Sequence, residues 1–351
     1  MTPPRLLLVP DKFRDSITAA EFCEAASAAA AASGWAADGV EVSDGGEGFA
    51  RIVAPEGEVR EEKVAGPLGD EVRAQWRLAE SAGRRVAVIE AAAACGLQLA
   101  GGSPGNDAVR ATTRGVGELI AAGLAAGADQ IIVGCGGSAS TDGGRGALEA
   151  LCAFPPPGVG PLGGAELVVA YDVGTMFRDA AARFGPQKGA SSEQVLELER
   201  RLEDLAALYE SSTGRDSSRV AGTGSAGGLA GGLASVGGRL RPGFEIVAEA
   251  VGLSQRLAAC DAVVTGEGCL DEGSFDGKVV GGVIDACARP PSRPAVLCVV
   301  GRATPGAKRA ARGAGAAVVV LSERFGEDSS FRDASALVRD VVTEWLTSLA
   351  R

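Results

Sequence analysis

Short runs of apolar residues recur along the chain, and each has the length of a buried β-strand. The runs lie in "RLLLVP" (5–10), "QIIV" (130–133), "AELVVAYD" (165–172), "DAVVTG" (261–266), "AVLCVVG" (295–301) and "AAVVVLS" (316–322). Strands without polar alternation are typical of parallel sheets whose two faces are both covered by helices. A further short strand is predicted at the start of "GVEVSDGGEG" (39–48), where it runs directly into a loop of glycine and acidic residues.

Helical patterns separate several of these runs. Residues 191–212 form the clearest amphipathic segment, with one apolar stripe made of Val195, Leu198, Leu202, Leu205 and Leu208. Thr18 and Glu21 have the spacing of a capping box and predict a helix that ends near Gly34. Residues 58–90 instead alternate around Gly-Pro turns, which predicts hairpins rather than crossover connections.

The charge balance limits the classes of partner. Acidic residues outnumber basic ones by 45 to 34, which gives a net charge of −11 and argues against nucleic acid or an anionic membrane. No apolar run approaches the roughly 18 residues of a membrane span, and the amino terminus lacks the apolar region of a signal peptide. The eight cysteines include no C-x-x-C pair. We therefore expect a cytoplasmic protein with reduced thiols.

The sequence contains no histidine, which excludes Ser-His-Asp and Cys-His nucleophilic sites, histidine metal sites and a histidine general base. Any acid or base is therefore a carboxylate, a lysine or a tyrosine. Only five lysines stand beside 29 arginines. Lys12, Lys188 and Lys278 fall in loops rich in glycine or acidic residues, which favours a functional placement, because ammonium and guanidinium groups contact phosphate differently.

Four loops with the composition of ligand sites follow predicted strands, namely "PDKFRDS" (10–16), "SDGGEG" (43–48), "GCGGSASTDGG" (134–144) and "TGEGCLDEGSFDGK" (265–278). In open α/β sheets, ligands bind beyond the carboxyl ends of strands, and glycine lets backbone N–H groups face a phosphate. Glycine and aspartate are also ordinary residues of βα turns, so one such loop would mean little. Four in one chain favour a site for phosphoryl transfer.

The charged residues of these loops fit that chemistry. Candidates to hold Mg²⁺ or to accept a hydroxyl proton are Asp44, Glu47, Asp142 and Asp271. Candidates to neutralise phosphates and a substrate carboxylate are Lys12, Arg14, Lys188 and Lys278. Ser138 and Thr141 are interpreted as phosphate contacts rather than nucleophiles, because no histidine is present to activate them.

The stretch "GTGSAGGLAGG" (222–232) satisfies G-x-G-x-x-G at Gly222, Gly224 and Gly227. A dinucleotide-binding fingerprint needs a strand immediately before it, and only a polar run precedes this one. We predict a tight turn followed by a small-residue helix from Ser225. Its glycines serve either ligand contact or close packing.

Taken together, these stretches resemble the bacterial glycerate kinases of the first type over nearly the whole chain. The matching stretches, in the family's order, are "VPDKFRDSITA", "SDGGEG", "VAGPLGDEV", "AVIEAAAACGLQL", "GGSASTDGG", "FGPQKGA", "GTGSAGGLAGGL", "RPGFEIVAEAVGL" and "TGEGCLDEGSFDGK". The resemblance implies an α/β fold in which a Rossmann-like parallel-sheet domain (1–58 and 244–351) is interrupted by an inserted α/β domain with glycine-rich loops (59–243). It also implies ATP-dependent phosphorylation of D-glycerate to 2-phosphoglycerate, or of a close 2-hydroxy acid, with Mg²⁺, by a monomer or homodimer.

The site residues expected on this basis fall into three groups. The predicted catalytic residues are Asp44, Asp271 and Lys278. The predicted substrate- or nucleotide-binding residues are Asp11, Lys12, Arg14, Ser16, Gly45, Gly46, Glu47, Gly137, Ser138, Thr141, Gly143, Lys188, Gly224, Gly227 and Glu267. The predicted metal ligands are Asp142 and Asp172.

Several positions depart from the family pattern. Arg14 and Asp15 stand where Lys-Gly is usual, and Thr141 replaces an asparagine. The usual Arg, Gln, Thr and His of the last loop are replaced by Cys269, Gly273, Ser274 and Asp276. These changes fit either a changed substrate or weakened activity. The alternative function is therefore a catalytically weakened relative that binds a nucleotide or hydroxy acid as a regulatory protein; a nicotinamide-dependent oxidoreductase would rest on G-x-G-x-x-G alone.

Overall fold

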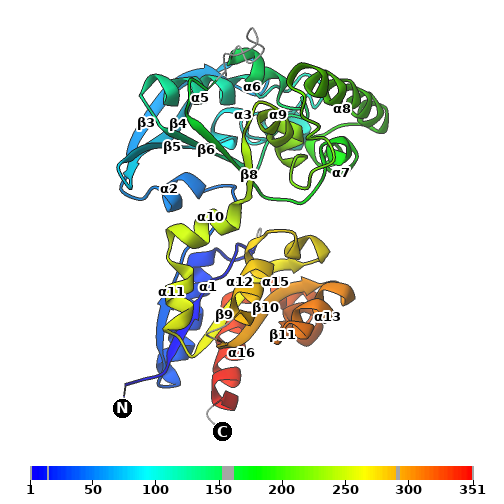
Figure 1. Cartoon of the computed structure of the whole chain (residues 1–351). Helices are drawn as coiled ribbons and strands as arrows, with labels where there is room; N and C mark the ends of the chain where they lie inside the picture. The colour runs from blue at the N-terminus through cyan, green and yellow to red at the C-terminus, as the bar shows by residue number, and fades with distance from the viewer. Residues whose placement is uncertain (1, 14–15, 152–161, 290–292, 350–351) are drawn as a thin grey trace. The chain divides into compact units, whose positions relative to one another are not determined.

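The computed structural model describes residues 2–13, 16–151, 162–289 and 293–349 (Figure 1). The chain divides into two compact units: unit 1 comprises Met1–Ser43 and Val247–Arg351, and unit 2 comprises Asp44–Ile246. The first predicted boundary, after residue 58, is therefore displaced. Residues 44–58 join unit 2 because Phe49, the first residue of helix α2 (Phe49–Val53), packs on Gly134 of the second unit's sheet.

Unit 1 contains a five-stranded sheet in the order β11-β10-β9-β1-β2, and every neighbouring pair is parallel. Its strands are β1 (Arg5–Leu8), β2 (Ala36–Gly39), β9 (Ala262–Leu270), β10 (Ala295–Ala303) and β11 (Ala316–Val320). Its helices are α1 (Ala19–Ala32), α11 (Leu253–Ala258), η4 (Glu272–Phe275), α12 (Val279–Ala288), α13 (Pro305–Gly313), α14 (Leu321–Phe325), α15 (Glu327–Arg332) and α16 (Ala334–Leu349). Helix α10 (Gly243–Ala250) spans the boundary between the units.

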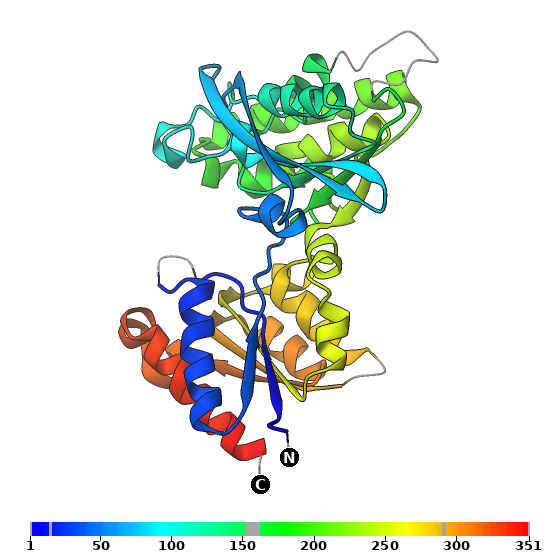
Figure 2. The same cartoon turned by 90° about the vertical axis from the view of Figure 1, so that its left-hand side faces the viewer.

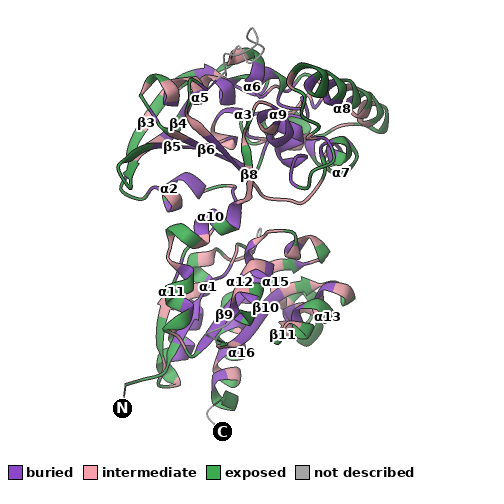
Figure 3. Cartoon of the chain, viewed as in Figure 1, coloured by how far each residue is buried: buried purple, intermediate pink, exposed green. Residues whose placement is uncertain are grey.

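Helices cover both faces of this sheet, as continuous apolar strands require. Helices α1 and α16, blue and red in Figure 2, lie side by side on one face. There Leu6 and Leu8 of β1 pack with Phe22 of α1 and Val338 of α16 in one buried cluster. Helix α12 packs against β9 and β10. Figure 3 shows both of these strands as buried along most of their length.

Unit 2 contains a six-stranded mixed sheet in the order β3-β4-β5-β6-β7-β8. Its strands are β3 (Glu58–Ala65), β4 (Glu71–Ser81), β5 (Arg84–Glu90), β6 (Gln130–Cys135), β7 (Glu166–Tyr171) and β8 (Arg239–Pro242). The pairs β3–β4 and β4–β5 are antiparallel, which confirms the predicted hairpins, and the remaining pairs are parallel.

The helices of unit 2 bury one large apolar cluster against this sheet. Besides α2 they are α3 (Ala92–Cys95), α4 (Gly102–Gly105), α5 (Arg114–Ala125), α6 (Arg145–Ala150), η1 (Phe177–Asp179), α7 (Ala180–Phe184), η2 (Pro186–Lys188), α8 (Ser192–Thr213), η3 (Ser225–Gly228) and α9 (Leu229–Ser235). The cluster contains Trp76 of β4, Ile131 of β6, Leu119 of α5 and Leu202 of α8. Within the described residues, no helix combines the length and apolar character that crossing a membrane requires.

Three predicted elements differ in detail from the structure. Strand β2 ends at Gly39, where the prediction began, because its partner β1 ends at Leu8, the residue paired with Gly39. On α8, Leu208 is 46% exposed and Tyr209 is buried in its place, since buried positions 198, 202, 205 and 209 follow the helical period more closely. The predicted helix from Ser225 starts only at Leu229.

The late start of helix α9 has its cause in the backbone conformation. Ala226, Gly227 and Gly228 are consecutive left-handed residues, with φ of 51°, 66° and 90°, which an α-helix cannot include. The turn places Gly227 against the Ser140 carbonyl, and a Cβ on Gly232 of α9 would come within 2.6 Å of the Gly143 carbonyl oxygen. Close packing against the 140–144 backbone therefore accounts for Gly227 and Gly232.

This packing predicts opposite effects for the same substitution at two helical glycines. Gly232→Ala should destabilise the protein by about 1–3 kcal/mol, because overlap with Gly143 outweighs the gain in helix propensity. Gly313→Ala, at the end of α13 with nothing within 4 Å of an added Cβ, should be neutral or stabilise by up to about 1 kcal/mol. Urea unfolding followed by tryptophan fluorescence measures both. Equal effects at the two sites would contradict the packing explanation.

Candidate active site

Two of the predicted loops and the segment that follows β7 meet at one edge of the sheet in unit 2. Parallel strands β5, β6 and β7 end side by side, with Glu90 paired to Gly134 and Cys135 to Tyr171. Loop 136–142 continues from β6, and Asp172 follows β7. Loop 44–48 lies against the same edge, because an added Cβ on Gly136 would come within 2.6 Å of the Gly46 Cα. The structure thus brings the loops of Asp44, Ser138 and Asp172 together.

Loop 44–48 is fixed by Glu90, a residue that sequence reasoning did not select. Its Oε1 accepts a hydrogen bond from the Ala50 N–H at 2.9 Å, at the start of α2. Burial raises the pKa of Glu90, while hydrogen bonds from the Ala50 and Gly48 N–H groups lower it. An acidic residue at the end of the apolar run "VAVIE" was the available signal. It indicates a buried carboxylate that needs partners.

Lys188 reaches loop 136–142 from η2. Its side chain is buried, and its ammonium donates to the Ser138 hydroxyl at 2.9 Å and to the Ser140 carbonyl at 2.5 Å. Burial lowers the pKa of Lys188 to about 8, although nearby Cys95, Asp172 and Asp142 raise it. The two predicted binding residues Ser138 and Lys188 are thus in direct contact.

Asp142 has a structural role that its prediction as a metal ligand did not foresee. Its carboxylate accepts from the backbone N–H groups of Thr113, Gly144 and Gly146 at 2.8, 3.0 and 3.2 Å, and from the Thr113 hydroxyl. It therefore ties the first turn of α5 to that of α6. These bonds occupy both oxygens, so Asp142 does not fit a metal ligand.

Other predicted binding residues of unit 2 lie within the packed backbone. Thr141 is fully buried, and Gly143 donates its N–H to the Gly227 carbonyl at 3.1 Å. Gly224 donates its N–H to the Thr175 carbonyl at 2.9 Å. Gly45 and Gly46 belong to the loop beside β6, and a Cβ on Gly45 would meet the Ala170 carbonyl oxygen at 3.3 Å.

A second group of predicted residues lies in unit 1, in the segment after β1 and within and after β9. Asp11 donates its N–H to the Gly266 carbonyl at 2.8 Å, which holds the segment after β1 beside β9, the strand that contains Glu267. Burial of Glu267 raises its pKa to about 7; Ser274 and Lys278 lower it, whereas the carboxylates of Asp11 and Asp271 raise it. With this pKa, the Glu267 carboxyl group changes between its protonated and ionised forms near neutral pH.

The remaining predicted residues of unit 1 have varied surroundings. Asp271 caps η4, since its Oδ1 accepts from the Ser274 N–H at 3.1 Å. Ser16 donates its hydroxyl to the Phe331 carbonyl at 2.9 Å. Lys12 is exposed, and Lys278 occupies the position immediately before α12. Arg14 lies outside the described residues.

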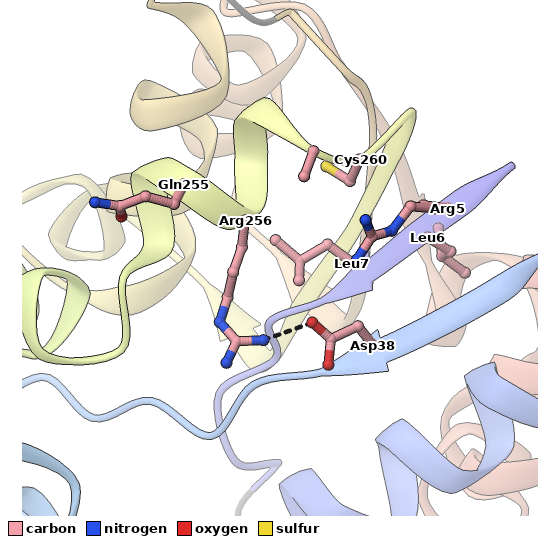
Figure 4. Close-up of a pocket in the computed structure, with 8 residues that line it drawn as sticks. Arg5, Leu6, Leu7, Asp38, Gln255, Arg256 and Cys260 are labelled. Carbon is pink, nitrogen blue, oxygen red and sulfur yellow. Dashed lines mark hydrogen bonds and ion pairs between the residues drawn. The ribbon is translucent and has the colours of Figure 1, made fainter.

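A surface cavity of about 200 Å³ lies elsewhere in unit 1 (Figure 4). It opens beside Arg5, at the amino end of β1, whereas ligands of parallel sheets bind beyond the carboxyl ends. Arg256 and Asp38 form an ion pair at 2.5 Å across it. We therefore place no candidate residue there.

A sequence model of the glycerate kinase family matches residues 6–154 and 160–350. The chain belongs to the glycerate kinase family. Among curated relatives, glycerate 2-kinase of Escherichia coli is 35% identical over 317 residues, covering 81% of this chain and 82% of the relative. Glycerate kinase of Bacillus subtilis is 36% identical over 313 residues, covering 80% and 81%. An uncharacterized protein of Mycobacterium bovis is 42% identical over 305 residues, covering 84% and 78%.

A solved structure is similar as well. The crystal structure of a protein assigned as glycerate kinase 2 from Salmonella typhimurium matches with a TM-score of 0.71 at 28% identity, covering 99% of this chain and 98% of that one. The α/β fold of this glycerate kinase family member, with its parallel-stranded sheets and flanking helices, is therefore that of a glycerate kinase structure.

The family resemblance also implies Mg²⁺, which needs oxygen ligands such as carboxylates. No group of three or more Asp, Glu or Cys side chains that could hold a metal ion occurs in the part of the chain that the structure describes. Mg²⁺ at nucleotide sites is held by one or two carboxylates together with substrate phosphates. Asp172, half-buried beyond the end of β7, has the carboxylate chemistry for such a role and stays the predicted ligand in this family member.

The pKa of Glu267 predicts a pH-dependent difference in stability. Because its folded pKa of about 7 lies above the ordinary 4.5, ionisation disfavours the folded state, and wild type loses stability as pH rises from about 4.5 to about 7. Glu267→Gln cannot ionise and avoids that loss. Its stability relative to wild type should therefore rise across this range by up to about 3 kcal/mol.

Urea unfolding at pH 5 and pH 8 measures this in a Trp76→Phe background, where Trp35 and Trp345 report unit 1 alone. Glu24→Gln, on the exposed side of α1, controls for the loss of one carboxylate. A stability difference for Glu267→Gln that is the same at both pH values would contradict the raised pKa.

Proposed function

We propose that this protein is an ATP-dependent kinase that phosphorylates D-glycerate and gives 2-phosphoglycerate. The observation that carries the proposal is the match to the glycerate kinase family model, which includes all four predicted loops. A relative with the name glycerate 2-kinase supports it. Two of these loops, 43–48 and 134–144, lie with the segment of Asp172 at the carboxyl edge of β5, β6 and β7. This supports the proposal, since α/β proteins bind ligands at such edges.

In the proposed reaction, a hydroxyl group of glycerate attacks the terminal phosphorus of ATP. The hydroxyl oxygen forms a bond to phosphorus, the bond from phosphorus to the bridging oxygen of ADP breaks, and the hydroxyl proton must be accepted. Asp44 is the proposed acceptor, because it is half-buried in a loop whose backbone lies against Gly134 of β6 and Ala170 of β7. A carboxylate in this position orients the hydroxyl as well.

Cationic groups have to balance the charges of the phosphates and of the glycerate carboxylate. We assign this role to Lys278 and Lys12 in unit 1, and to Lys188 through loop 136–142 in unit 2. Lys278 precedes α12, a ten-residue helix whose free N–H groups favour an anion. Mg²⁺, when bound with ATP, would neutralise charge on the transferred phosphoryl group, with Asp172 as its proposed protein ligand.

A second candidate is a binding or regulatory protein with weakened catalysis. One observation favours it: Cys269 is exposed near the carboxylates of Glu267 and Asp271 and stands where the family has arginine, so the charge of that arginine is lost, and the cations near Cys269 are Arg302 and Lys278. The cytoplasmic location and the monomeric or homodimeric state remain predictions for either function.

The activity itself is the first test. With ATP, D-glycerate and Mg²⁺, the purified protein should release ADP and form 2-phosphoglycerate, which phosphorus NMR distinguishes from 3-phosphoglycerate. Excess EDTA should abolish turnover, and Mn²⁺ should restore it. ATP binding without turnover of glycerate or other 2-hydroxy acids would favour the binding protein. Full activity in EDTA would contradict the role of a divalent cation.

Lys278 gives a test of the anion site. Lys278→Ala should lower kcat/KM by roughly 10- to 100-fold, the effect of losing one charged hydrogen bond of about 1.5–3 kcal/mol. Lys278→Arg should recover only part of this, because a planar guanidinium cannot occupy the position of the ammonium. Lys308→Ala is the matched control in the same unit, since Lys308 pairs with Glu323 on the surface. Equal values for the two alanine variants would make Lys278 an ordinary surface cation.

A further inference from the structure

Asn106 is the single asparagine in the 351 residues. It follows α4 immediately and joins two segments that are distant in sequence. Its side-chain Nδ2 donates to the Ala139 carbonyl at 3.0 Å and to the Lys188 carbonyl at 2.8 Å. Both hydrogens of the amide are used, one on loop 136–142 and one on the segment that carries the buried lysine.

These contacts complete a closed ring of hydrogen bonds. From the other side, the Lys188 ammonium donates to the Ser138 hydroxyl and to the Ser140 carbonyl. The ring thus runs from Asn106 to Ala139, along the backbone to Ser140, across to the Lys188 ammonium and back through the Lys188 carbonyl. A shift of either segment would break at least one of these bonds.

The rest of the loop is anchored independently. Ala139 donates its N–H to the Cys95 carbonyl at 2.7 Å, and Leu97 donates its N–H to the Gly137 carbonyl at 3.0 Å. At the far end, Asp142 holds the starts of α5 and α6. Against these fixed points, Asn106 sets how closely the lysine segment approaches the loop.

We propose that Asn106 is a positioning residue for phosphoryl transfer, which holds loop 136–142 and the Lys188 ammonium at a fixed separation. The proposal rests on the proposed kinase function. Both partners of Asn106 are carbonyl oxygens, which can only accept. Aspartate, of similar size but with acceptor oxygens, could not replace the two hydrogen bonds that the amide donates. Lys188 is buried, so an error in its placement leaves an ammonium without its partners.

The kinetic test uses Asn106→Ala, with Gln98→Ala as matched control, because Gln98 is an exposed amide in the same region of the chain. Asn106→Ala should lower kcat by about 10- to 100-fold, because groups at the site would be displaced from the geometry that the reaction needs. The KM for ATP and for glycerate should change less than about threefold. The control should retain wild-type values. Combined with Lys188→Met, Asn106→Ala should lower kcat by less than about threefold further, because both act through one ring.

A second readout does not depend on any substrate. In the wild-type protein, acetic anhydride at pH 8 should acetylate buried Lys188 much more slowly than exposed Lys63, and peptide mass spectrometry resolves all five lysines. Asn106→Ala should raise the Lys188 rate relative to Lys63 at least about tenfold, and Gln98→Ala should not. If wild type fails to phosphorylate glycerate, the proposed function falls, and this labelling still decides whether Asn106 holds Lys188.

Wild-type kcat and labelling in Asn106→Ala would overturn the proposal. So would multiplicative effects of Asn106→Ala and Lys188→Met, which would show that the two residues act separately. Should the alanine variant fail to fold, Asn106→Asp takes its place and should show the same losses. Loss of the fold in both variants would show that Asn106 is a folding determinant and would also overturn the positioning role.

Discussion

Close contact between backbones at the carboxyl edge of the six-stranded sheet is the constraint on which the candidate site of unit 2 depends. Loop 44–48 meets loop 136–142 at Gly46 and Gly136, and the 222–232 stretch meets the latter at Gly227. A methyl group at Gly136 or Gly227 would overlap the facing chain. The loops can therefore lie this close only because glycine occupies the contact positions. The fold itself requires these glycines, whether or not they also contact a ligand.

The same close contact shuts polar groups away from water, and a buried polar group without a partner inside the protein costs free energy. Glu90 receives the first N–H groups of α2, and Asp142 receives those of α5 and α6. Lys188 and Asn106 satisfy the carbonyls of Ser140 and Ala139. Buried polar side chains thus take over where a regular sheet or helix would have supplied the partners, and they also fix the loop geometry.

Much of the fold could be predicted from the sequence, because the spacing of apolar residues and the positions of turn residues depend on local structure. The parallel strands, the hairpins of 58–90 and the capping box at Thr18 and Glu21 were found in this way. The end of β2 could not be, since it depends on where β1 stops. Asp142 was assigned to a metal because an acidic residue in a glycine-rich loop can either bind a metal or cap helices. Thr113, 29 residues earlier, decides between them, and that contact exists only in the folded chain.

Rare residue types carry a signal that local patterns miss. A buried arginine at position 188 would bring five donors into a site that the structure fills with a compact ammonium. Lysine therefore stands there in a chain that has 29 arginines and five lysines. The lone asparagine, Asn106, is tied to that same lysine. Scarcity alone does not identify a site, because Lys63 and Lys308 lie in surface ion pairs. Scarcity together with burial does point to a site. At a buried position only one residue type supplies the donors that the surrounding acceptors need, whereas a solvent-exposed position accepts several residue types.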